Sequence, residues 1–181
     1  MKQATRKWLK LRPQAQYIGR VKHTPVEGKV PNQCQQNSYG EVHTNNAKWV
    51  AGWVIGDYSK EHDQSPVIFH FWNVDKNGNW YDTSPGMDAQ NFEYVYDMDV
   101  ADVPYNMCKK YGNKNLYFPP AIKIKSNSVM VNLDSGKKMT YDWLPIDPDT
   151  PIDLEELMTK VHKLNHSKGR ESLFSDQKEE A

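Results

Sequence analysis

The stretch Val-Ile-Phe-His-Phe-Trp-Asn-Val (67–74), followed by Asp-Lys-Asn-Gly-Asn (75–79) and Trp-Tyr-Asp-Thr (80–83), has the clearest structural pattern in the sequence. Residues 67–74 are apolar on both faces apart from His70 and Asn73, which is typical of a buried central strand. The Asn-Gly pair in 75–79 favours a turn that leads back into a second strand over 79–83. We therefore expect an antiparallel hairpin at the centre of the protein.

Further elements surround this hairpin. Residues 48–58 alternate, with Trp49, Ala51, Trp53 and Ile55 on one face, and predict a strand. A second hairpin is expected over 128–143, around Asp134-Ser135-Gly136, and a helix over 153–164, where acidic residues in the first turn and lysines in the last suit the helix dipole. Together these elements predict an α+β fold in which a helix packs across an antiparallel sheet.

A helix that carries Cys34 in its first turn is expected to begin near residue 34. Pro31 precedes Asn32, a good N-cap, and Gln35 follows three residues later in a pattern like a capping box. This places Cys34 in the first turn. The helix is expected to run to about His43 and to end at Asn45-Asn46.

Length and charge limit the possible classes of protein. The 181 residues carry 23 basic and 23 acidic side chains, and this zero net charge argues against a nucleic-acid partner. The longest apolar runs are only a few residues, so we expect no membrane span, and the charged start lacks a secretory signal. We expect a cytoplasmic protein with a single domain over 31–164, a basic arm over 1–30 and a disordered polar tail over 165–181.

The charges are unevenly spread along the chain. Residues 1–30 hold eight Lys or Arg and one acid, whereas residues 81–108 hold six acids and no Lys or Arg. We expect these segments to be solvated or to attract each other, and the alternative is that they recruit a charged partner.

Three polar residues stand where nucleophilic catalysis needs them. Cys34 opens a helix, His70 lies in a buried strand, and Asp82 lies on the strand that returns from it. A helix start and an imidazolium both lower the pKa of a thiol, and a carboxylate fixes the orientation of the histidine. The sequence therefore predicts catalytic roles for Cys34 as nucleophile, His70 as base and Asp82 as orienting group.

The register of the hairpin decides whether Asp82 can reach His70. With an odd-length loop, such as Lys76-Asn77-Gly78, Trp72 faces Asp82, and His70 and Asp82 share one face diagonally. A two-residue Asn77-Gly78 turn would put them on opposite faces. The sequence does not choose between the loops, but the mechanism requires the odd one.

Supporting roles are assigned to four further residues. The backbone N–H of Cys34 and a side-chain amide would hold the oxyanion, with Gln33 and Asn37 as candidates, although Asn37 could equally brace the cysteine or its neighbouring loop. Trp53 and Trp72 are expected to form the wall of a cleft.

The motifs His70-Phe71-Trp72-Asn73 and Gly78-Asn79-Trp80-Tyr81-Asp82-Thr83 resemble those of the transglutaminase-like branch of the papain-like cysteine superfamily. Cys34-Gln35-Gln36-Asn37 and Ala51-Gly52-Trp53 also resemble small bacterial and phage proteins. The resemblance spans residues 31–85. It implies the same three roles for Cys34, His70 and Asp82. Two departures are that Thr83-Ser84-Pro85 replaces Pro-Thr, and that no apolar helical segment precedes Cys34.

The expected function is cysteine-dependent acyl chemistry without a cofactor on a protein or peptide substrate: hydrolysis as a peptidase, amidase or deamidase, or transfer to an amine. The alternative is a protein-binding module that uses the acidic segment 87–102 or the basic arm. In such a module charge reversal at Asp97 and Asp99, but not Cys34→Ala, would abolish function. A third hypothesis is a zinc site at Cys34, His70 and Asp82, although no ligand spacing supports it. Cys108 is expected to be structural or incidental.

Overall fold

The computed structural model describes residues 1–61, 63–85, 91–133, 142–169 and 173. This part of the chain holds four helices: α1 (Gln3–Leu11), α2 (Cys34–Asn45), α3 (Asp99–Tyr111) and α4 (Leu154–Ser167). Its strands are β1 (Gln16–Gly19), β2 (Lys22–His23), β3 (Lys48–Ile55), β4 (Ser65–Val74), β5 (Trp80–Asp82), β6 (Glu93–Tyr96), β7 (Ile122–Ile124), β8 (Val129–Asn132) and β9 (Trp143–Ile146). The predicted α+β class is confirmed.

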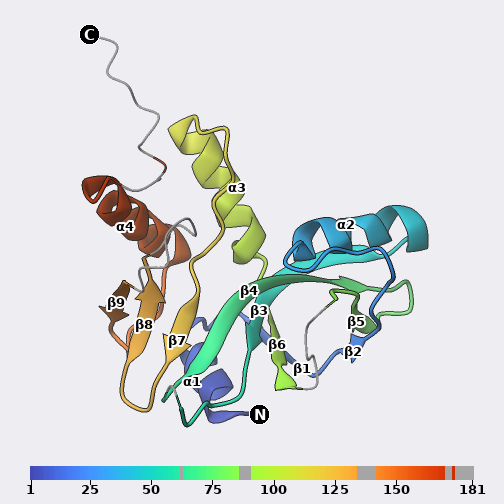
Figure 1. The fold of residues 1–181 in the computed structure, drawn as a ribbon, viewed down its shortest axis with the longest axis horizontal. Helices are drawn as coiled ribbons and strands as arrows, with labels where there is room; N and C mark the ends of the chain where they lie inside the picture. Colours follow the sequence, from blue (N-terminus) through green and yellow to red (C-terminus); the bar gives the residue numbers. More distant parts are fainter. Residues whose placement is uncertain (62, 86–90, 134–141, 170–172, 174–181) are drawn as a thin grey trace.

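The described strands form one open sheet in the order β1-β6-β3-β4-β7-β8-β9 (Figure 1). Neighbours in this order are antiparallel, and β2 pairs in parallel with β5. Strand β4 is central, as predicted, because β3 covers one of its edges while β7 and β5 pair with different parts of the other. Helix α2 lies over β3 and β4 at the end of the sheet near β5 (Figure 1).

The β4–β5 hairpin has the register that the predicted triad requires. Asn73 lies opposite Tyr81 and Val74 opposite Trp80, and the Asp75 N–H donates to the carbonyl oxygen of Asn79 at 3.0 Å. Gly78 takes the left-handed conformation, with φ +84°, where a side chain would be strained. The loop therefore has the odd length of three residues.

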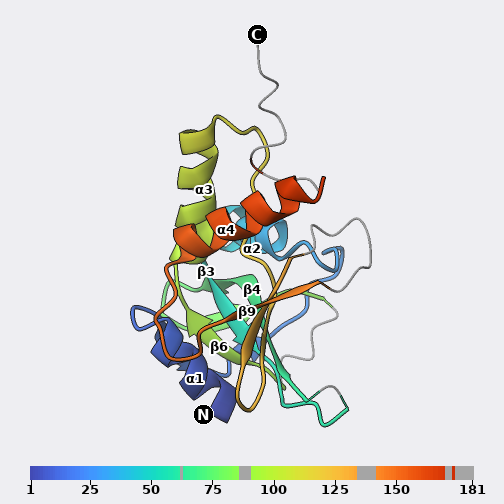
Figure 2. The ribbon, with the colours of Figure 1, turned by 90° about the vertical axis from the view of Figure 1, so that its left-hand side faces the viewer.

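Two apolar clusters lie on the two faces of the sheet. The larger one joins Ala51, Trp53 and Ile55 of β3, the alternating face expected from the sequence, to buried residues of α1, α3 and α4. These three helices gather on one side of the strands (Figure 2). The smaller one holds Val21, Val50, Val54, Trp72 and Tyr94. His70 alternates with Phe71 and so lies on the same face of β4 as Trp72.

The expected basic arm is wrong, because residues 3–11 form a helix that belongs to the main core. Ala4, Trp8 and Leu11 are buried and follow helical spacing. The Trp8 ring packs edge-on against Trp53 at 4.8 Å between centroids. Residues 16–19 then form β1.

The boundaries of the other helices differ in detail. Asn32 is not the N-cap of α2: its φ is +62°, Gln33 takes that position, and no side chain caps the helix start among the described residues. The helix ends as expected, with Asn46 left-handed. Helix α4 runs past Leu164 to Ser167, so the tail does not begin at 165. Strands β8 and β9 form the second hairpin, whereas its turn over 134–141 and the tail residues 170–172 and 174–181 lie outside the described residues.

Candidate functional site

Cys34 is the first residue of α2 and is half-buried. Because no described side chain caps this helix start, the first backbone N–H groups are not occupied by a capping group. They give the helix start a partial positive charge, which favours a thiolate or an oxyanion. The sequence led us to expect this position.

His70 and Asp82 meet across the hairpin. The His70 Nε2 and Asp82 Oδ2 atoms are 2.7 Å apart, and the two residues are 5% and 1% exposed. Because Nε2 is bound to the carboxylate, Nδ1 is the ring nitrogen available to the thiol.

The surroundings of His70 favour its charged form. Burial alone lowers the pKa of His70, but hydrogen bonds to Asp82 and to Cys34, and the charges of both, raise it to about 9. The structure thus brings together all three residues of the expected triad. At neutral pH the imidazole is protonated and lies next to the thiol group.

Asp82 is held by further contacts from three directions. Its Oδ1 accepts the Ser84 N–H at 2.8 Å, and its Oδ2 accepts the Tyr94 hydroxyl at 2.7 Å. Its carbonyl oxygen accepts the N–H of Thr24, beyond β2, at 2.8 Å. Burial raises the pKa of Asp82, but the hydrogen bond and charge of His70, followed by the Ser84 and Tyr94 bonds, lower it overall. The carboxylate therefore stays ionised and fixed in position.

Tyr94 is a member of the site that the sequence did not indicate. It lies on β6, is fully buried, and shares the Asp82 oxygen that binds His70. Burial and then the Asp82 charge raise its pKa, so it remains a hydrogen-bond donor. Its alternation with Val95 along 93–96 is the signal that could have placed it on the face of His70.

Gly52 lies opposite His70 on β3 and allows the site to close. A Cβ atom there would overlap the Val95 carbonyl oxygen and lie 2.8 Å from the Trp72 ring. The Gly52-Trp53 pair noted in the sequence thus has a packing reason. A larger residue would separate β6, and with it Tyr94, from the site.

The two amides expected near the oxyanion have different surroundings. Gln33 is exposed, and its backbone oxygen accepts the Asn37 N–H at 2.9 Å. The Asn37 side chain is buried and binds both backbone groups of Val30, at 2.8 and 3.3 Å. Asn37 therefore braces the loop before Cys34, which was the second of its two expected roles.

Neither tryptophan forms the wall of an open cleft, because both are fully buried. Trp53 lies in the main core, where its Nε1 donates to Asp97 at 2.9 Å. Trp72 lies next to His70 on β4, and the two rings are nearly parallel, with centroids 6.2 Å apart. Trp72 is thus a buried support of the histidine.

No group of three or more His, Cys, Asp and Glu side chains could hold a metal ion among the described residues. No described helix combines the length and the apolar character needed to cross a membrane. Comparisons with protein-family models, with curated proteins and with solved structures find no match. The argument for function therefore depends on the geometry of the site.

The pKa of His70 predicts how stability depends on pH. Because folding raises this pKa from 6.5 to about 9, the stabilisation is fully present below pH 6.5 and is lost as pH rises to about 9, a loss of about 3 kcal/mol. Urea unfolding at several pH values should show this loss in the wild type, and the His70→Gln variant should lack it. Equal pH dependence in both proteins would contradict the prediction.

Proposed function

We propose that the protein is a cysteine-dependent acyl-group hydrolase, acting as a peptidase, amidase or deamidase on a protein or peptide substrate. The observation that carries the proposal concerns His70, which is buried and bound to Asp82. Although burial lowers the pKa of His70, its hydrogen bonds to Asp82 and Cys34 and the charges of these two residues raise that pKa to about 9. A protonated imidazole at neutral pH favours a thiolate at Cys34, which is the reactive form of a cysteine.

The proposed reaction proceeds in two halves. The Cys34 thiolate attacks the substrate carbonyl carbon, and the backbone N–H groups at the start of α2 stabilise the oxyanion. The His70 imidazolium then gives its proton to the leaving amine, the C–N bond breaks, and a thioester remains. In the second half, neutral His70 takes a proton from water, the hydroxide attacks the thioester, and the acid and the Cys34 thiolate are released.

Asp82 and Tyr94 would keep the imidazole in the orientation that both halves require. An amine in place of water would give acyl transfer by the same steps. Hydrolysis is the simpler proposal for a chain of 181 residues, because transfer requires a binding surface for a second substrate.

We also propose that the fold contains a papain-like core of the transglutaminase-like branch. The order of Cys34, His70 and Asp82 supports this, with the cysteine opening α2 and the other two on the β4–β5 hairpin. Both cysteines are free thiols, so we propose action in the reducing cytoplasm.

The experiment that tests the function measures the rate at which iodoacetamide alkylates each cysteine as a function of pH, by mass spectrometry. We expect Cys34 to react at pH 6 far faster than an ordinary thiol, whose pKa is about 8.5, and His70→Ala to remove this reactivity. Cys108 is an internal control, since its Sγ lies 2.9 Å from the Asn115 carbonyl oxygen, a group that does not take up the thiol proton. A Cys34 profile like that of Cys108 would overturn the proposal.

A further inference from the structure

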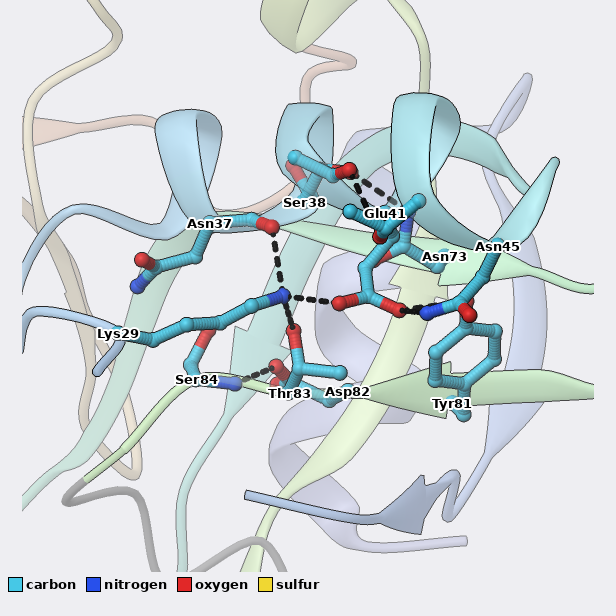
Figure 3. A network of polar contacts seen from close by, with 12 residues as sticks. Lys29, Asn37, Ser38, Glu41, Asn45, Asn73, Tyr81, Asp82, Thr83 and Ser84 are labelled. Atoms are coloured by element: carbon cyan, nitrogen blue, oxygen red, sulfur yellow. Dashed lines mark hydrogen bonds and ion pairs between the residues drawn. The ribbon is translucent and has the colours of Figure 1, made fainter. Parts of the chain in front are cut away.

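An ion pair next to the site connects α2, which begins at Cys34, to the residue that follows Asp82 at the end of β5. We call Lys29, Asn37, Glu41 and Thr83 the Lys29 cluster (Figure 3). The Lys29 and Glu41 side chains, which form the ion pair, are 13% and 4% exposed. A buried ion pair contributes little net stability compared with apolar residues of the same size. The Lys29–Glu41 ion pair is therefore important for the segments that it connects rather than for the stability that it adds.

All three N–H donors of the Lys29 ammonium group can be accounted for. They reach the carbonyl oxygen of Asn37 at 2.8 Å, the Thr83 hydroxyl at 2.7 Å and Glu41 Oε1. In Figure 3 the ammonium nitrogen lies between α2 and the end of β5, with dashed contacts in both directions.

Glu41 extends the same connection. Its Oε2 accepts the Asn45 amide at 2.7 Å and the Tyr81 hydroxyl at 3.2 Å. Burial raises the pKa of Glu41, but the hydrogen bonds and the Lys29 charge lower it overall. Glu41 therefore stays charged and binds both α2 and β5.

These contacts fix the distance between two parts of the triad. Thr83 directly follows Asp82, and Lys29 lies in the loop whose Val30 is braced by Asn37, three residues after Cys34. Asp82 in turn holds His70. A displacement of α2 relative to β5 would thus move the thiol away from the imidazole.

We propose that Lys29 is a positioning residue that holds Cys34 at its working distance from His70 through Thr83 and Glu41. The inference rests on the proposed function. It predicts that loss of the Lys29 cluster leaves a folded protein with a poorly formed thiolate–imidazolium pair. A role in stability alone predicts that removing both charges together leaves the reactivity of Cys34 unchanged.

The test uses the alkylation profile of Cys34 against pH in the full chain. Lys29→Met/Glu41→Gln removes both charges, so that neither is left buried and unpaired. Thr83→Val removes only the contact to the Asp82 segment, and Thr83→Ser retains the hydroxyl. Lys110→Met/Glu155→Gln is the matched control, because that ion pair of 2.7 Å is exposed and joins α3 to α4. Circular dichroism establishes that each variant is folded.

We expect alkylation at pH 6 to fall about tenfold in the Lys29/Glu41 variant and about threefold in Thr83→Val, since small misplacements of reacting groups have effects of this order. Thr83→Ser and the Lys110/Glu155 variant should keep the wild-type profile. If the Lys29/Glu41 variant does not fold, the alkylation profile of Thr83→Val alone tests the proposal. Wild-type profiles in the folded variants overturn the proposal for Lys29 alone, whereas an ordinary thiol in the wild type overturns the proposed function as well.

Discussion

Asp82→Asn is expected to slow the alkylation of Cys34 at pH 6 by about a hundredfold, because an unpaired thiol of pKa about 8.5 is less than about 1% ionised there. Asparagine keeps the shape and can still accept the Tyr94 hydroxyl, but it removes the charge that raises the pKa of His70. Burial, the largest single influence on this pKa, then lowers it against the contacts of Cys34 alone. The histidine becomes neutral, and the thiol loses its charged partner.

The same variant should reduce kcat on an acyl substrate by roughly a thousandfold or more, since the histidine is no longer held in one tautomer. Asp149→Asn, at an exposed carboxylate, is the control and should behave as the wild type. The titration of the His70 ring can be followed by NMR. A folded Asp82→Asn protein with wild-type alkylation would contradict the role of this carboxylate.

Asp97→Ala is expected to lower the free energy of unfolding by about 3–5 kcal/mol, the usual cost of removing one member of a buried ion pair. Asp97 binds Arg12 Nε at 2.8 Å, and both side chains are almost fully buried. It also accepts the Trp53 indole N–H. The variant would leave two buried donors unpaired and weaken the attachment of α1.

Asp99→Ala is the matched control, because Asp99 also binds Arg12 but its side chain is 43% exposed. Its loss should cost about 1 kcal/mol or less. Urea unfolding measures both values, and a loss below about 1 kcal/mol for Asp97→Ala would contradict the prediction. Charge reversal at Asp97 would also destabilise the fold because Asp97 is buried against Arg12, so Asp99 is the better position at which to test the binding-module alternative.

The contacts of Arg12 also explain why basic and acidic residues are unevenly spread along the sequence. The basic segment 1–30 and the acidic segment meet in the fold through Arg12 with Asp97 and Asp99, and through the Lys2 backbone N–H with Glu93. Of the two roles expected for these segments, mutual attraction is the one observed at these contacts.

The central strands could be predicted because the pattern of apolar residues that identifies a strand lies within a few consecutive residues. Strand β3 alternates, and residues 67–74 of β4 are apolar apart from His70 and Asn73, so neighbouring residues alone identify both strands. Helix α1 was missed because its lysines and arginines dominate the composition, although Ala4, Trp8 and Leu11 follow a helical period. The cap at Asn32 was wrong because the backbone there is left-handed, in a loop whose Val30 is bound by the Asn37 side chain.

The three triad residues could be proposed from their places in the expected helix and hairpin. The register that lets Asp82 reach His70 could not be predicted, since the sequence does not choose between an odd and an even loop. Tyr94 was not predictable in this way because it reaches Asp82 from β6, a strand that was not assigned. Trp53 was placed in a cleft because the sequence does not show that α1 covers its face of β3. Lys29 and Glu41 carry no sequence signal at all, since a charged pair on a loop and a helix is usually exposed.

Because β6 lies between β1 and β3 in the sheet, it joins two strands that are both synthesised before it. Sheets with such distant pairings fold slowly, over roughly milliseconds to seconds. At a synthesis rate of about 5–20 residues per second, Cys34, His70 and Asp82 are all made before Tyr94 and Asp97. We therefore expect the nascent chain to hold a complete set of reactive groups that becomes ordered only when β6 enters the sheet.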